Sequence, residues 1–380
     1  MNKAERGDWN PRDASILKDQ RQAYDEMRER CPVAHSEFMG WSLFRHADIA
    51  AVLAETETYS NASKFVAIPN GMDSPVHGPY RAALTGFFDE DHMAKLEPRI
   101  REIAANLIES MLGGEDAEFM DAFATPFALK TLCAMLGWPE SQWECLGGWT
   151  HGNQQAAFSQ DPAVGKALHS LFSEHTKANL NLHRNSSGKM DDATDALLKA
   201  EVGGKRFDDD QIVSILRNWT AGHGTVVAGL SILAMHLAQR PELQARLRSD
   251  SSLIPAAIEE ILRADGPLVA NRRTTTREVE IQGRTIPKGE YLALMWIAAN
   301  RDPRAFNDPD TVDIERSTDA SLVWGQGVHF CLGASLARLE MRVALEELRS
   351  RSERIELATG APRRAVYPSN GLAALSLRIS

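Results

Sequence analysis

The chain has few cysteines, and their spacing excludes several kinds of site. Its 380 residues include only Cys31, Cys133, Cys145 and Cys331, and no two of them form a C-x-x-C pair. This spacing argues against a zinc site and against a disulfide framework. A G-x-G-x-x-G sequence and a phosphate-binding loop are also missing, so these two nucleotide-binding motifs are excluded.

Positive charge is in deficit. The chain has 42 Lys and Arg residues against 52 Asp and Glu residues, which gives a formal net charge of −10. This charge, together with the lack of a basic run with interleaved aromatics, disfavours nucleic acid as a partner. The segment from Met1 to Pro11 is polar and lacks the apolar stretch of a signal peptide or membrane anchor. We therefore expect a cytoplasmic protein with no membrane partner.

No Gly/Ser/Pro-rich linker, low-complexity tract or internal repeat divides the chain. Hydrophobic residues make up 43% of it and charged residues 25%, which is ordinary for a soluble globular protein with a large core. We predict a single domain over residues 1–380, of which residues 1–12 are expected to be flexible.

The most informative feature that is present is the run from Trp324 to Gly333, which places Cys331 in a glycine-rich loop. Gly325 and Gly327 allow backbone conformations closed to other residues, and Gly333 lets backbone N–H groups approach the sulfur. Apolar residues recur at helical spacing beyond the cysteine, so Cys331 is expected near a helix N-terminus, where a thiolate is favoured. An isolated cysteine is more often an inert buried thiol, but this loop favours a metal-bound thiolate.

A long helix is predicted from about Asp210 to Arg240, because acidic residues mark its start and Pro241 follows its end. Apolar residues cover nearly all its faces, which predicts a buried central helix. Inside it, Gly222 and Gly224 each cost about 1 kcal/mol relative to Ala, so both need a structural or functional reason.

The Trp324–Gly333 run resembles the haem-binding loop of the cytochrome P450 family: aromatic, Gly, any, Gly, any, basic, any, Cys, any, Gly. The resemblance extends from about Met72 to Leu375. It implies a mainly α fold with small β-sheets in a single domain, heme b (iron protoporphyrin IX) as cofactor, and Cys331 as the iron ligand. Trp324 departs from the usual Phe, and its indole N–H is expected to alter packing and hydrogen bonding beside the sulfur.

The family's oxygen-binding helix carries Ala-Gly, two residues and Thr, which Ala221, Gly222 and Thr225 match. The resemblance implies that Thr225 presents its hydroxyl to dioxygen; the alternative is a bond back to the carbonyl four residues earlier. Gly224 stands where the family commonly has an acid, so the usual proton donor is missing. His223 is a candidate proton relay or, alternatively, a hydrogen-bonded structural residue.

Four basic residues are candidates to pair with the haem propionates: His77, Arg81, Arg273 and His329. Arginine suits a carboxylate because its planar fork can bond to both oxygens. Arg272 competes with Arg273, because neighbouring residues of a strand face opposite ways. The resemblance thus implies cofactor contacts from His77, Arg81, Ala221, Gly222, Arg273, Trp324, Gly325, His329, Cys331 and Gly333.

Substrate contacts are expected from three segments that line the pocket in the family. The predicted residues are Phe65, Val66, Ile68, Val269 and Leu372. The segment from Ser60 to His77 that holds the first three is short, which is typical either of a compact pocket or of a trimmed surface loop.

Glu260 and Arg263 lie three apart on one helical face and can pair. With Arg316 they resemble the ion-paired trio of the family, which implies a role in folding and haem retention rather than in chemistry.

The implied function is a haem-thiolate monooxygenase. It would hydroxylate or O-demethylate a small, mostly apolar or aromatic organic substrate with dioxygen. We expect no fused reductase domain, so electrons are expected from a separate ferredoxin or similar partner.

Arginines 338, 342, 349 and 351 either dock an acidic partner of this kind or form a solvated face with neighbouring glutamates. Two alternative functions stay open. A hydrogen-peroxide-dependent peroxygenase is suggested by Gly224, and a non-catalytic haem-based ligand binder is the more distant alternative.

Overall fold

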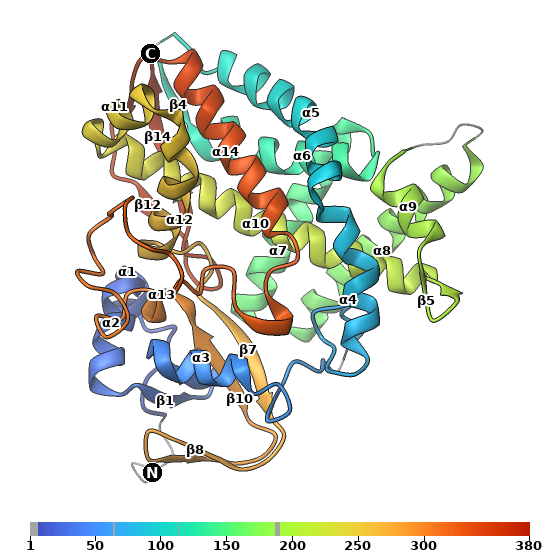
Figure 1. The fold of residues 1–380 in the computed structure, drawn as a ribbon, viewed down its shortest axis with the longest axis vertical. Helices are drawn as coiled ribbons and strands as arrows, with labels where there is room; N and C mark the ends of the chain where they lie inside the picture. The colour runs from blue at the N-terminus through green and yellow to red at the C-terminus, as the bar shows by residue number, and fades with distance from the viewer. Residues whose placement is uncertain (1–6, 64, 114, 187–190) are drawn as a thin grey trace.

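The computed structural model describes residues 7–63, 65–113, 115–186 and 191–380, and it is mainly helical (Figure 1). The helices are α1 (Ala14–Lys18), α2 (Gln20–Arg30), α3 (His46–Ala54), α4 (His77–Thr85), α5 (Glu90–Glu109), α6 (Thr125–Leu136), α7 (Trp143–Ser159), α8 (Pro162–Asn185), α9 (Ala193–Lys199), α10 (Asp209–Ala238), α11 (Pro241–Ser249), α12 (Ile254–Ala264), α13 (Trp296–Ala299) and α14 (Ala334–Arg351). The strands are β1 (Val33–Ser36), β2 (Gly40–Leu43), β3 (Tyr59–Ser60), β4 (Asp116–Glu118), β5 (Glu201–Val202), β6 (Lys205–Arg206), β7 (Ala270–Thr275), β8 (Val279–Ile281), β9 (Arg284–Ile286), β10 (Tyr291–Met295), β11 (Ile355–Leu357), β12 (Arg363–Arg364), β13 (Leu372–Ala374) and β14 (Ser376–Ile379).

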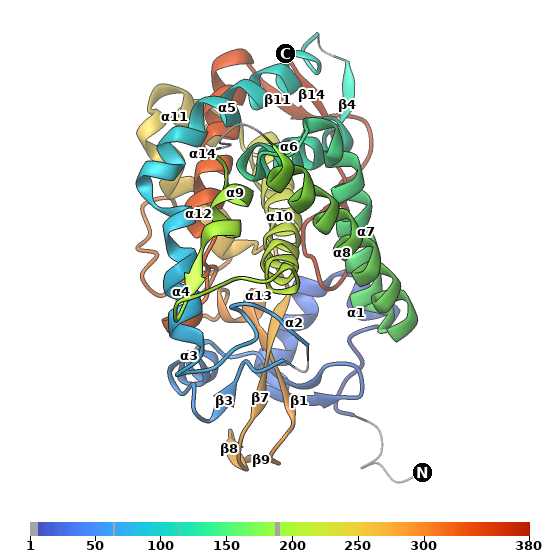
Figure 2. The same cartoon turned by 90° about the vertical axis from the view of Figure 1, so that its right-hand side faces the viewer.

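Helix α10 is the predicted central helix, confirmed to within two residues at each end. The Asp208 carboxylate accepts from Gln211 N at 2.8 Å, and the Gln211 side chain accepts from Asp208 N at 3.0 Å, which closes a capping box. Figure 2 shows α10 upright in the centre, with α12 and α14 on one side and α7 and α8 on the other. Among the described helices α10 alone has the length and apolar composition of a membrane span, but 72% of that window is buried in this protein.

The largest sheet lies at the end of the molecule where the chain begins, in the strand order β1-β2-β10-β7-β3. β10 pairs antiparallel with β7, with Arg273 opposite Leu292, and parallel with β2. This pairing sets the direction in which the residues of β7 face, which matters for the site. Strand β8 pairs antiparallel with β9, with Val279 opposite Ile286.

Within the segment 1–12, which is expected to be flexible, the residues that the structure describes pack against the core. Trp9 is 8% exposed, and its ring packs edge-on against Tyr24 and Phe44. Asp8 N donates to His35 O at 2.8 Å. A large aromatic side chain buried in this way ties the segment to the core. Residues 1–6 lie outside the described residues.

The trio of Glu260, Arg263 and Arg316 is confirmed as a buried ion-paired cluster. Glu260 and Arg263 are fully buried, with Nε–Oε2 at 2.7 Å and Nη2–Oε1 at 2.8 Å. Arg316 Nε donates to Glu260 Oε1 at 3.0 Å. Arg263 also donates to the carbonyls of Asn300 (2.7 Å) and Pro309 (2.9 Å), so the cluster joins α12 to the long segment that leads to Cys331.

We predict that Glu260→Ala lowers the free energy of unfolding by about 3–5 kcal/mol, because it leaves a buried guanidinium without its carboxylate. Urea unfolding followed by circular dichroism measures this. Glu102→Ala is the control: Glu102 is exposed and pairs with Arg99 alone among the described residues, so its loss should cost under about 1 kcal/mol. Equal effects of the two substitutions would contradict the assignment.

Candidate active site

A cavity of about 520 Å³ separates α10 from the loop that carries Cys331. The residues lining it include Ala221, Gly222, His223, Thr225 and Val226 from α10, Trp324, Gly325, His329, Phe330, Cys331, Leu332 and Gly333 from the loop, and Leu268, Asn271, Arg272 and Arg273 from the segment entering β7 and from β7 itself. Three segments far apart in the sequence therefore meet around one space.

The Cys331 loop has the backbone geometry that its glycines predict. Gly325 and Gly327 both have φ of +71°, a conformation that side chains disfavour. Cys331 N donates to Trp324 O at 2.8 Å, which folds the loop back on itself. Helix α14 begins at Ala334, so Cys331 lies just before its N-terminus, as expected. The cysteine is exposed to the cavity rather than packed in the core.

The environment of Cys331 poses opposing electrostatic effects. Burial raises the pKa of the thiol, whereas the Gly333 N–H and the positive charges of Arg81 and Arg338 act to lower that pKa. A bound metal cation adds the further positive charge that holds such a sulfur as thiolate.

Trp324 hydrogen-bonds away from the sulfur, which corrects the expectation from the sequence. Its indole Nε1 donates to Glu259 Oε2 at 2.9 Å, and Arg338 Nε donates to Glu259 Oε1 at 2.7 Å. The Arg338 guanidinium also lies 4.8 Å from the centre of the indole ring. Position 259 supplies the acceptor, and no motif read in the sequence singled it out.

Of the four predicted basic residues, Arg273 and His329 line the cavity, and His77 and Arg81 lie beside His329 without lining it. The rings of His77 and His329 lie 4.4 Å apart between centroids. Burial, with the nearby charges of His77 and Arg273, lowers the pKa of His329 to about 4, and burial lowers the pKa of Arg273 to about 10. The Arg81 charge also acts on both His77 and His329.

The carboxylate of Asp73 lies near this basic edge and acts to raise the pKa of His77, Arg273 and His329, but it forms no ion pair with any of them among the described residues. Arg273 is 8% exposed, and its side-chain hydrogen bond among the described residues goes to the carbonyl of Arg272. The Nε2 atom of His77 is buried and has no partner in this part of the chain. A buried guanidinium without an ion-pair partner fits a buried anion. Arg272 also lines the cavity but is exposed, with its guanidinium 5.8 Å from the Tyr291 ring, so Arg273 is the better placed of the two.

Thr225 and Gly224 face different neighbours. The Thr225 side chain makes no hydrogen bond within the described residues, so the bond back to a helical carbonyl, which Thr220 does form, is not made here. A Cβ at Gly224 would lie 2.9 Å from Thr150 Cγ2 and 3.2 Å from Gln154 Nε2. Gly224 therefore allows α7 to pack closely on α10, and an acidic side chain at this position would have to displace the side chains of Thr150 and Gln154.

His223 is buried between α10 and α14. Its Nδ1 donates to Trp219 O at 2.8 Å, and its Nε2 lies 3.5 Å from Glu340 Oε1. Glu340 is fully buried, and neither of its oxygens has a hydrogen-bond partner in the described chain. Burial raises the pKa of Glu340, and the Glu340 carboxylate raises the pKa of His223 against the effect of burial. Glu340 was not among the predicted site residues.

The predicted substrate contacts are wrong in detail. None of Phe65, Val66, Ile68, Val269 and Leu372 lines the cavity; Phe65 and Val66 are 78% and 58% exposed, and the other three are core residues. The same segments line the cavity with other residues, namely Asn61, Pro69, Asn70 and Leu268, because alternation along the chain and turn geometry direct these side chains toward it. The sequence predicted which segments border the cavity, but it did not predict which of their side chains point into it.

The arginines of α14 are largely neutralised by glutamates. Arg338 pairs with Glu259, Arg342 with Glu97 and Glu346, and Arg351 with Glu109 and Glu347. Arg349 donates to the carbonyl of Arg248. The reading as a solvated, charge-mixed face is therefore favoured over a basic docking patch.

Comparison with known proteins identifies the family. The cytochrome P450 family model matches residues 162–351. The chain is 34% identical to erythromycin C-12 hydroxylase of Saccharopolyspora erythraea, covering 87% of this chain and 86% of that protein. It is 31% identical to cyclomarin C epoxidase CymV of Salinispora arenicola, with 89% of each covered. The chain belongs to the cytochrome P450 family.

The P450 fold is equally clear in solved structures. A mutant of P450 EryK in complex with erythromycin B superposes with a TM-score of 0.87 at 31% identity, covering 95% of this chain and 96% of that one. CYP109E1 from Bacillus megaterium, in complex with testosterone, superposes with a TM-score of 0.83 at 26% identity, covering 97% and 99%.

Haem is the cofactor of P450 enzymes, and the residues of this cavity fit it. A cysteine sulfur is open to the cavity on one side, and Ala221 and Gly222 of α10 leave space on the other. The acid-poor basic edge suits the two propionates. Haem held by a thiolate supplies the activation of dioxygen and the transfer of one oxygen atom.

We expect Cys331→Ala to abolish the strongly red-shifted Soret band of the ferrous carbon monoxide complex, because no other thiolate would reach the iron. Absorption spectra of the haem-loaded variant measure this. Cys145→Ala is the control, since Cys145 is an exposed cysteine on α7. An unchanged spectrum in Cys331→Ala with haem bound would rule out this ligand.

We also expect Arg273→Gln and His77→Gln to release haem faster than the parent protein does, because each removes a buried partner of the propionates. Haem transfer to apomyoglobin gives the rate. Arg272→Gln, the exposed neighbour, should behave as the parent. If Arg272→Gln releases haem and Arg273→Gln does not, the two assignments must be exchanged.

Proposed function

We propose that this P450 monooxygenase hydroxylates or O-demethylates a small organic substrate in the cavity between Cys331 and Thr225, in the cytoplasm, with electrons from a separate ferredoxin or similar protein. The observation that carries the proposal is a single cavity that brings the cysteine sulfur and the α10 residues Ala221, Gly222 and Thr225 together. A hydroxylase and an epoxidase among the relatives support oxygen insertion as the reaction class.

The cavity lining favours a substrate with some polar groups on an apolar frame. Phe88, Trp219, Leu268 and Trp296 supply apolar surface, and five asparagines line the same space, namely Asn61, Asn70, Asn218, Asn271 and Asn300. Asn61 Oδ1 is buried and has no partner among the described residues, so it is available to a hydroxyl or amide of the substrate. This refines the expectation of a mostly apolar substrate.

The chain's own residues orient the reactants and hold the proton. The Thr225 hydroxyl faces the cavity with no bond of its own to break, so it can donate to a ligand there. His223 and Glu340 together hold a proton that neither loses readily to bulk water, because both are buried beside the cavity. We propose that this pair replaces the acid that the family commonly carries at position 224.

The direct test of the function is turnover with isotopically labelled dioxygen. Candidate substrates are first chosen by the shift of haem spin state that they cause on binding. With ferredoxin, ferredoxin reductase and NADPH, one labelled oxygen atom should appear in the product of hydroxylation. Label that enters only from water, or the lack of any product from every tight binder, contradicts a monooxygenase. Efficient turnover with hydrogen peroxide and no reductase favours the peroxygenase instead.

We predict that Glu340→Gln and Thr225→Ala each lower the rate of product formation by about tenfold or more and raise hydrogen peroxide release, because proton supply and reactant orientation are lost. Glu340→Gln should in addition increase the solvent isotope effect on turnover, which a purely structural change would not do.

Glu346→Gln is the matched control for Glu340→Gln, since Glu346 lies on the same helix but pairs with arginines at the surface. The carbon monoxide spectrum verifies that each variant keeps its haem site. A Glu340→Gln enzyme with the product yield per electron and the isotope effect of the parent places the proton route elsewhere.

A further inference from the structure

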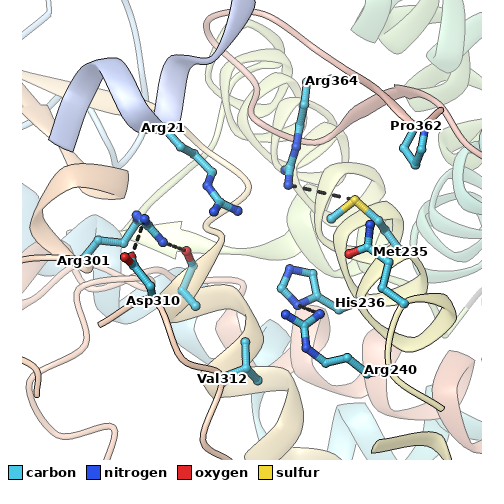
Figure 3. Close-up of a pocket in the computed structure, with 11 residues that line it drawn as sticks. Arg21, Met235, His236, Arg240, Arg301, Asp310, Val312, Pro362 and Arg364 are labelled. Atoms are coloured by element: carbon cyan, nitrogen blue, oxygen red, sulfur yellow. Dashed lines mark hydrogen bonds and ion pairs between the residues drawn. The ribbon is translucent and has the colours of Figure 1, made fainter. Parts of the chain in front are cut away.

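A second cavity, of about 330 Å³, lies at the C-terminal end of α10 and shares no lining residue with the haem cavity. His236 lies 11 residues beyond Thr225 on α10, which separates the two residues by roughly 16 Å along the helix axis at 1.5 Å per residue. Arg240 lies four residues further along the chain. Figure 3 shows its lining side chains, which are Arg21, Met235, His236, Gln239, Arg240, Ala264, Arg301, Asp310, Val312, Pro362 and Arg364.

Four guanidinium groups from four separate segments line this cavity. Arg21 comes from α2, Arg240 from the residues just after α10, Arg301 from the residues after α13, and Arg364 from β12. In Figure 3, Arg21 and Arg364 reach in from one side and Arg240 from the other. Such convergence of cations is unfavourable unless anions balance it.

The protein's own acids balance only part of this charge. Asp265 is fully buried and accepts from Arg364 Nη1 at 2.9 Å and Nη2 at 2.6 Å, with Arg21 Nη1 at 3.2 Å from the same carboxylate. The single negative charge of Asp265 is therefore shared between Arg364 and Arg21. The positive charges of Arg364 and Arg21 help to hold the pKa of Asp265 below its usual range despite its burial, so this acid stays ionised.

Arg301 is already neutralised, because it pairs with Asp25 at 2.8 Å and Asp310 at 2.5 Å. It also donates to the carbonyl of Ala264 at the end of α12, at 3.2 Å. This arginine therefore has little to offer a ligand.

Arg240 is the least satisfied of the four. It donates to His236 Nδ1 at 3.0 Å and pairs with no carboxylate among the described residues. His236 Nε2 in turn donates to Asp265 Oδ2 at 3.1 Å, so the imidazole is fixed as the neutral tautomer with its proton on Nε2. Burial, against the pull of Asp265, lowers the pKa of His236. Arg240 thus keeps most of its N–H donors and its full charge.

From this geometry we propose that the cavity binds a small phosphate anion, with Arg240 and Arg21 as the direct donors. The four arginines carry four positive charges and Asp25, Asp265 and Asp310 carry three negative ones, so one positive charge is in surplus. This surplus lies at Arg240, which has no carboxylate partner among the described residues. Guanidinium forks match tetrahedral oxyanions well, since they donate in parallel pairs. The source is either free inorganic phosphate or the phosphoryl group of a metabolite, for which the cavity also leaves room.

The haem-loaded protein tests the proposal, because haem then covers the other basic cluster. Titration with inorganic phosphate at constant ionic strength, followed by calorimetry, should give saturable binding that an equal concentration of chloride does not. Phosphate should also raise the midpoint of thermal unfolding by mass action. Glycerol phosphate separates the sources: tighter binding than inorganic phosphate assigns a phosphorylated metabolite, and equal or weaker binding assigns free phosphate.

Arg240→Gln and Arg21→Gln should each weaken phosphate binding by about tenfold or more, because each removes a charged donor. Arg99→Gln is the control, as Arg99 is half-exposed on α5 and pairs with Glu102 and Glu140. The carbon monoxide spectrum and helix content should stay those of the parent in all three.

The proposal is overturned by any of three results. The first is phosphate binding no stronger than chloride binding. The second is equal affinity in the parent, Arg240→Gln and Arg21→Gln. The third is preferential binding of an acidic peptide over phosphate, which would make the cavity a docking point for protein.

Discussion

The buried carboxylate of Glu260 is the interaction on which the rest of the site depends. It accepts from Arg263 and Arg316 and also from Asp313 N at 3.0 Å, all within a region closed to solvent. An uncompensated carboxylate there would be strongly unfavourable. Helix α12, which carries Glu260 and Arg263, must therefore meet the segment that carries Asp313 and Arg316 in one arrangement. That arrangement fixes the chain between α13 and the Cys331 loop, and so places the sulfur across the cavity from α10.

Helix α10 links the chemical site to the remainder of the molecule. Its middle turns border the haem cavity, where glycine lets α7 approach closely at position 224. Its last turn and the residues after it border the arginine-lined cavity. The same helix therefore carries a buried His223 that faces Glu340 and, near its end, a His236 that joins Asp265 to Arg240.

Three clusters of basic residues in this protein differ in how much of their charge is balanced. At the haem edge, Arg273 and His77 are buried and form no ion pair among the described residues, although the charge of Asp73 acts on both, and this suits a dianion that stays in place. On α14, in contrast, arginines alternate with glutamates and form a paired surface. The arginine-lined cavity lies between these extremes, since Asp265 and Asp310 offset part of its charge.

The sequence by itself determined those features that depend on local geometry. Positive φ at Gly325 and Gly327, the capping box of α10 and the spacing of Glu260 and Arg263 are all properties of short segments, so the loop, the helix and the ion pair could be predicted. The convergence of His77, Arg273 and His329 followed from the resemblance to a family, not from local pattern.

Only the tertiary structure decided which side chains face each space. Val269 is buried in the core while Leu268 lines the cavity, because pairing of β7 with β10 and the turn before it set the direction of each residue. The Trp324 indole donates to Glu259, and His223 faces Glu340, across helices that are distant in sequence. Such contacts depend on packing between elements, and a pattern along one element does not encode the distance to a partner on another.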